Sequence, residues 1–301
     1  MKLSVNEVKQ FYRIWFPLLI YINQKLEIVP EFEDYFEAND IHPEDAVPIR
    51  EALWENDALR EAFIKENPAK LSEGDLAIVD SWQYRVADSF FVFRYLKKHT
   101  VFLNGESPPK AYGVLGLTSS FEEMLGPYVP HYIQAVLLPF GDKIIYDSLF
   151  APYSISFGGG IKSSLRDSYR AVQERTGVIT SLLPPTKADR KALKQDIMTR
   201  NKKLLKVFQK DLGKSGLSPQ KMIEHHDNVM KFAQEYLALQ NPPKLLLDIG
   251  QMDITAYIRS SPRKVNLVSI KRFLWFLRDT GRIYYGDAED MLAFLKKQRK
   301  T

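Results

Sequence analysis

The chain has 301 residues, 45% of them hydrophobic, so it can bury a sizeable core and form more than one domain. It contains no cysteine, which excludes disulfides, thiolate catalysis, iron–sulfur clusters and cysteine zinc sites and favours a reducing cytoplasm. Residues 1–185 carry 18 Lys and Arg against 25 Asp and Glu, whereas residues 186–301 carry 24 against 12. An acidic body therefore precedes a basic C-terminal third, which suggests that the two parts meet different partners.

The first elements are predicted to be helices, from residue 3 to about residue 70. The apolar stretch FYRIWFPLLIYI, residues 11–22, is too short to span a bilayer, contains Arg13 and Pro17, and precedes no small-residue cleavage site. We therefore expect a buried amphipathic helix there and no membrane partner. The helical pattern ends at Asn67-Pro68, because proline prevents its continuation.

From residue 75 the chain is rich in β-branched and aromatic residues in short runs, which predicts strands. SSFEEMLG is expected to form a short helix, capped by serine and ended by Gly126. The three glycines in SISFGGGIKSS lack P-loop spacing, so they predict a tight turn into a helix and no nucleotide cofactor. The expected organisation is a helical segment over 1–74, a β-rich α+β domain over 75–185 and a basic helical domain over 186–301.

The last domain is predicted to begin after Pro184-Pro185, where Thr186 can cap a long helix. One face of that helix is apolar, with Leu193, Ile197, Leu204, Val207 and Phe208. A second helix begins at Ser218-Pro219, a capping residue followed by proline at the first helical position. Its expected core stripe is Met222, Val229, Phe232, Ala233, Tyr236 and Leu237.

His225 and His226 in the second helix raise the question of a metal site. Helical zinc ligands need a spacing such as i and i+4, and adjacent residues diverge by about 100°. We therefore expect no metal and a partly buried or solvent-facing pair. An enzyme in the β-rich domain would draw on His99, Tyr112, His131 and Asp147, but these match no recognised catalytic spacing. No catalytic residue is predicted.

Three stretches of the basic domain carry a resemblance: LLKVFQKDLGKSGLSPQKMIEHHDNVMKFAQEYL, LLDIGQMDITAYIRSS and KVNLVSIKRFLWFLRDTGRI. Together they resemble the SAM-like N-terminal core-binding domain of tyrosine recombinases and phage integrases, over about residues 200–300. The matching positions are Gly216, Leu217, Ser218, Ile254, Tyr257, Ile258, Arg259, Ser269, Phe273, Phe276, Leu277, Gly281 and Ile283. The resemblance implies an all-α four-helix bundle that clamps duplex DNA.

Two departures limit what the resemblance implies. Lys221 stands where the family often has threonine, and YYGDAEDML replaces the Asn-Pro after the fourth helix. The Arg, His-x-x-Arg and Tyr constellation of strand cleavage does not follow, so recombinase activity is not implied. Residues 1–183 also resemble a group of uncharacterised bacterial proteins, on KENPAKLSEGDLAIVDSW, YGVLGLTSSFEEMLG and LLPFGDKIIYDSLF; that resemblance implies no activity.

The leading hypothesis is therefore a cytoplasmic, non-enzymatic DNA-binding protein of the α+β class, whose acidic N-terminal part binds a protein or self-associates. Lysines and arginines would neutralise phosphates, while Gln220, Asn266 or Arg263 would read bases. The candidate DNA-binding residues are Lys202, Lys203, Lys206, Lys210, Lys214, Gln220, Lys221, Arg263, Lys264, Asn266, Lys271, Arg272 and Arg278. The alternative is a protein–protein adaptor whose basic domain engages an acidic partner.

Overall fold

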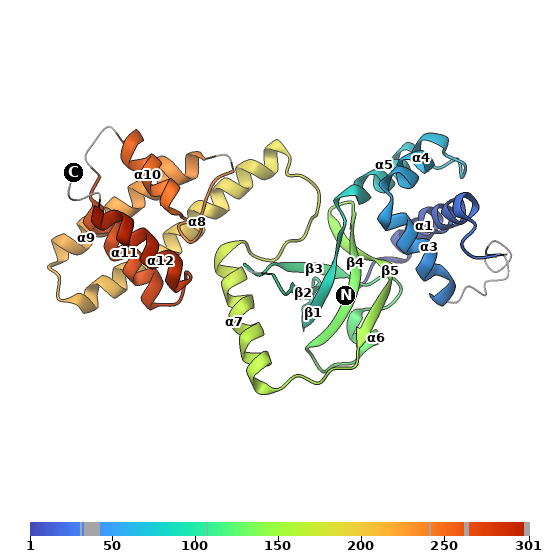
Figure 1. Cartoon of the computed structure of the whole chain (residues 1–301), viewed down its shortest axis with the longest axis horizontal. Helices are drawn as coiled ribbons and strands as arrows, with labels where there is room; N and C mark the ends of the chain where they lie inside the picture. The colour runs from blue at the N-terminus through green and yellow to red at the C-terminus, as the bar shows by residue number, and fades with distance from the viewer. Residues whose placement is uncertain (31, 33–42, 107, 241, 262–264, 298–301) are drawn as a thin grey trace. The chain divides into compact units, whose positions relative to one another are not determined.

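The structure, a computed structural model, describes residues 1–30, 32, 43–106, 108–240, 242–261 and 265–297 (Figure 1). The fold is α+β, and the chain divides into two compact units, Met1–Pro184 and Pro185–Thr301. The helices of 1–74 and the strands that follow share one hydrophobic core. The expected N-terminal helical segment and the β-rich domain therefore belong to a single unit.

Before the barrel, the described helices are α1 (Val5–Leu26), α3 (Pro43–Glu55), α4 (Asp57–Glu66) and α5 (Glu73–Ser81). Ser4 and Glu7 form a capping box at the start of α1, and Phe11, Trp15 and Leu18 are among its buried side chains. The helix predicted over residues 11–22 is thus confirmed. In contrast, the helix α5 occupies residues where a strand was expected, because Ser72 caps it and outweighs the β-branched Ile78 and Val79.

Five strands form a closed barrel in the order β1-β2-β3-β5-β4. They are β1 (Val86–Tyr95), β2 (Thr100–Asn104), β3 (Ala111–Leu115), β4 (His131–Phe140) and β5 (Lys143–Tyr153). β3 and β5 are parallel, the other pairs are antiparallel, and the short helix α6 (Phe121–Leu125) lies between β3 and β4. Ser120 and Gly126 bound α6, which confirms the predicted short helix. This Greek-key arrangement has the topology of an OB-fold.

The helix α7 (Gly159–Arg175) covers the outer surface of β1, β2 and β3 (Figure 1). Its Leu165, Tyr169 and Val172 are buried in one cluster with strand residues that include Val101 and Leu103. OB-folds commonly bind oligonucleotides through the face on their second and third strands. In this chain that face carries a helix, so the fold class alone assigns the barrel no ligand.

The second unit is helical over the described residues. Its α-helices are α8 (Lys187–Leu212), α9 (Pro219–Lys231), α10 (Gln251–Ser260), α11 (Leu267–Asp279) and α12 (Tyr285–Lys297). The predicted starts of α8 and α9 are confirmed, since the hydroxyl groups of Thr186 and Ser218 cap the two helices. After α9 the chain continues as a π-helical turn, Phe232–Tyr236, and a 3-10 turn, Leu237–Leu239.

The core of this unit contains most of the two predicted apolar stripes. Ile197, Leu204 and Phe208 of α8 are buried, together with Leu205 and Leu212. Leu193 and Val207 are about 40% exposed, so these two residues of the predicted stripe do not belong to the core. Among the described residues, no helix is long and apolar enough to cross a membrane.

Candidate nucleic-acid interface

One side of α8 carries four exposed lysines: Lys202, Lys203, Lys206 and Lys210. At 100° per residue they lie within an arc of about 100°, opposite the buried Leu204, Leu205 and Phe208. Among the described residues, none of the four forms an ion pair. We call these four residues the lysine face. It extends for roughly 12 Å along the helix, at 1.5 Å per residue.

Several other cations of this unit are neutralised locally. Arg200 Nε lies 2.6 Å from Asp196 Oδ2, and Lys244 Nζ lies 2.7 Å from Asp253 Oδ1. Arg278 is bound by Asp279 and Glu289, whose hydrogen bonds raise the pKa of its guanidinium. These ion pairs do not involve the lysine face, so its four positive charges are not compensated by described acidic side chains.

The other predicted DNA-binding residues differ in exposure and in ion pairing. Gln220 is exposed, and Lys214 is exposed and 3.8 Å from Asp211. Lys221 lies 2.6 Å from Glu224 and lowers the pKa of that carboxyl. Arg263 and Lys264 lie outside the described residues.

Three predicted residues have roles inside the unit. The Asn266 side chain caps α11 by accepting from the amides of Val268 and Ser269, and it donates to Glu224. Lys271 is buried and Arg272 is half-buried. Together with the paired Arg278, these positions do not extend the exposed lysine face, since packing between α9, α11 and α12 determines their surroundings.

His225 belongs to a buried polar cluster between α9 and α11. Its Nδ1 lies 2.9 Å from the Ser269 hydroxyl, which also accepts from the Asn228 amide at 3.1 Å. Burial lowers the pKa of His225, and the nearby charge of Arg272 adds to this effect. The neutral imidazole can therefore accept a hydrogen bond from the Ser269 hydroxyl at Nδ1. Of the expected partly buried or solvent-facing pair, His226 is half-buried and lies 2.9 Å from Asp227, whereas His225 is buried.

Over the described residues, no hydrogen bond joins any two of the four candidate enzyme residues. His99 packs its ring against Gly113, and burial lowers its pKa. Tyr112 is buried beside Phe90, 5.8 Å between ring centroids. Asp147 binds Arg50 and Trp54, and His131 begins β4. Nor does any group of three or more His, Asp or Glu in the described residues suit a metal ion.

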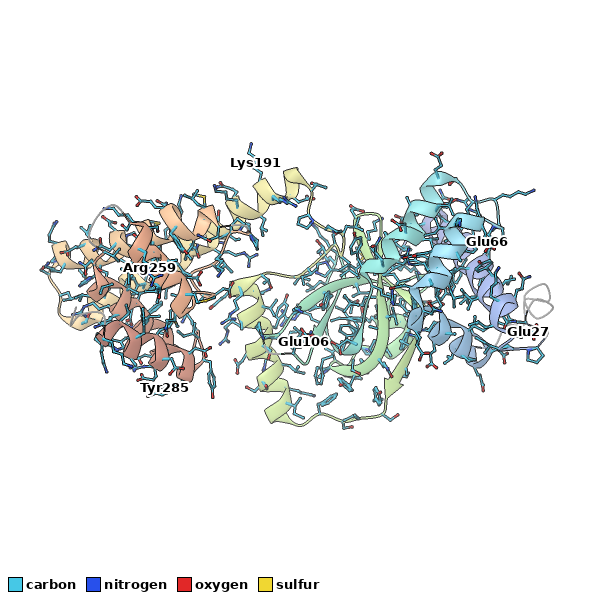
Figure 2. All side chains as sticks on the ribbon, turned by 45° about the horizontal axis from the view of Figure 1, so that its top comes forward. Glu27, Glu66, Glu106, Lys191, Arg259 and Tyr285 are labelled. Atoms are coloured by element: carbon cyan, nitrogen blue, oxygen red, sulfur yellow. The ribbon has the colours of Figure 1, made fainter. Side chains whose placement is uncertain are left out.

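Sequence reasoning missed a groove at the N-terminal end of α8, where Lys191 lies (Figure 2). The groove has a volume of about 550 Å³. It is lined by Pro185, Arg190, Lys191, Leu193, Lys194, Ala238, Leu239, Gln240, Pro242 and Pro243. The signal in the sequence was Leu193, an apolar residue on the inner side of α8, about one turn before the buried Ile197.

Comparisons with protein-family models, with curated proteins and with solved structures give no match for this chain.

Proposed function

We propose that the chain binds duplex DNA through the lysine face of α8. The observation that carries the proposal is the alignment of Lys202, Lys203, Lys206 and Lys210 on one side of a single helix, without ion pairs among the described residues. DNA carries one negative charge per ~1.7 Å of its axis, so an array of fixed cations releases several counterions when it binds. Such contacts position a protein on DNA and carry no sequence information.

The resemblance of residues 200–300 to the core-binding domains of tyrosine recombinases supports the same proposal. By that resemblance, α8–α12 would form a SAM-like bundle that clamps the duplex without cleaving a strand. Gln220 is an exposed side chain that could contact a base edge near the start of α9. The acidic unit, Met1–Pro184, would serve protein interaction or self-association, and the cysteine-free sequence suits the cytoplasm.

Fluorescence anisotropy of the full chain with a short labelled duplex tests the proposal. We expect binding at about 50 mM salt that weakens steeply toward about 200 mM. A variant with Lys202, Lys206 and Lys210 changed to Gln should lose most of the affinity. A matched variant with Lys231, Lys296 and Lys297 changed to Gln removes the same charge from α9 and α12 and should bind nearly normally. Absence of binding at low salt would favour the adaptor alternative.

A further inference from the structure

A groove lies on α8, at the end away from the lysine face. The first turns of this helix present Arg190, Leu193 and Lys194, on the side that is buried further along. These residues do not pack into the core of the helical bundle. Together with the segment that follows α9, they line an open groove. The first turns of α8 therefore leave their inner face uncovered by the core of the unit.

The opposite wall is largely apolar. Leu237 and Ala238 are buried, whereas Leu239 is 66% exposed, so the 3-10 turn turns one leucine outward at the groove. Pro242 and Pro243 follow, and they cannot continue a helix. Since Pro185 also lines the groove, three prolines with fixed backbone φ limit the conformational entropy that an occupant would have to remove.

The charges at the groove are all of one sign. Arg190, Lys191 and Lys194 line it, and no acidic side chain is among its lining residues in the described part of the chain. None of these three cations forms an ion pair with a described residue. An occupant must therefore combine carboxylates with an apolar side chain that fills the space between Leu193 and Leu239.

We propose that this groove binds an acidic peptide segment with an apolar or aromatic anchor. A concave apolar surface accepts a protruding side chain and cannot be filled by a flat bilayer. DNA phosphates would satisfy the cations but would leave Leu193 and Leu239 exposed. A peptide satisfies both, by the helix-in-groove or extended modes that acidic motifs use with basic surfaces.

A suitable probe has the chemistry of a segment in the chain itself, EFEDYFEANDIHPED, residues 31–45. As a free peptide it carries seven Asp and Glu, no Lys or Arg, and several aromatic side chains. Its control is the same peptide with every Asp and Glu replaced by the amide. Binding of both peptides to the full chain is measured by isothermal titration calorimetry, and sodium dodecanoate is tested as a competing small acid.

We expect the acidic peptide to bind and the amide peptide to fail. Leu239→Ser should weaken binding about tenfold or more, the effect of losing one buried leucine side chain. Ile223→Ser removes a comparably exposed apolar residue on α9 and should leave binding unchanged. Changing Arg190 and Lys194 together to Gln should weaken binding about tenfold, by loss of charge-assisted contacts.

Three results would overturn the proposal. They are no binding of the acidic peptide, equal binding of the amide peptide, and equal losses in the Leu239→Ser and Ile223→Ser variants. If dodecanoate binds and the acidic peptide does not, the groove accepts a small amphipathic acid and the proposal of a peptide site is wrong. The Lys202, Lys206 and Lys210 variant should still bind the peptide, so this site and the proposed DNA interface can fail independently.

Discussion

Arg50 on α3 and Asp147 on β5 form a buried ion pair, with Nε 2.6 Å from Oδ2. Trp54 donates a second hydrogen bond to the same carboxylate at 2.8 Å. Burial raises the pKa of Asp147, against the lowering effect of Arg50. Ser148, the next residue, has a left-handed φ of 73°, within an irregularity of the β4–β5 register. The pair therefore joins the N-terminal helices to the barrel where β5 departs from regular pairing.

Removing one member of this pair should destabilise the first unit strongly. Asp147→Ala leaves the Arg50 guanidinium buried without its partner, a loss of about 3–5 kcal/mol in the free energy of unfolding. Chemical denaturation followed by tryptophan fluorescence measures it. Asp142→Ala, at the exposed β4–β5 turn, is the control and should change stability by no more than about 0.5 kcal/mol. Equal stabilities of the two variants would contradict the interpretation.

Position 116 requires glycine because the backbone of Ser119 lies too close for a side chain. A Cβ at this position would lie 2.0 Å from the Ser119 carbonyl oxygen, a backbone atom. Gly116 also exchanges backbone hydrogen bonds with Met1 and Leu3. We expect Gly116→Ala to lower the free energy of unfolding by roughly 1–3 kcal/mol. Gly105→Ala is the matched control, since nothing lies within 4 Å of its added Cβ. A stable Gly116→Ala variant in thermal unfolding would refute the predicted clash.

His225 should make the stability of the second unit depend on pH. Its pKa is lowered in the folded state, so the unfolded chain binds more protons below the ordinary value of about 6.5. Stability is therefore fully present above that value, falls as pH drops through it, and levels off below the folded-state pKa. Urea unfolding by circular dichroism between about pH 5 and about pH 8 should show this loss.

The matched variant for this prediction is His225→Gln, which removes the titrating group. It should be less stable at neutral pH, because the Ser269 hydroxyl loses its buried partner, but its stability should vary less with pH. An unchanged pH profile in the His225→Gln variant would show that another group is responsible.

The sequence predicted those elements whose signals are local. Thr186, Ser218 and Pro219 fix the starts of α8 and α9 through capping and proline geometry. It could not predict the barrel closure or the cover of α7, since these depend on pairing between segments far apart in the chain.

For the candidate site too, the sequence predicts what depends on spacing within one helix and does not predict contacts between helices. Helical spacing places Lys202, Lys206 and Lys210 on one side, opposite the apolar residues, so their exposure follows from the sequence. Nothing local indicates that Asn266 donates to Glu224 on another helix, that Lys271 is buried, or that Arg278 reaches Glu289 on another helix. For the same reason sequence analysis did not find the groove, because its two walls are far apart in the chain, one with Arg190 and Leu193 and the other with Leu239 and Pro242.

The salt dependence of DNA affinity is the most direct test of whether the lysine face contacts DNA phosphates. If Lys202, Lys203, Lys206 and Lys210 each neutralise one phosphate, the slope of log K against log salt is about −3.6, at −0.9 per contact. Changing Lys202, Lys206 and Lys210 to Gln should reduce its magnitude by about 2.7, while the Lys231, Lys296 and Lys297 variant keeps the original slope. Equal slopes in the two triple variants would show that the charge of α8 is not where DNA binds.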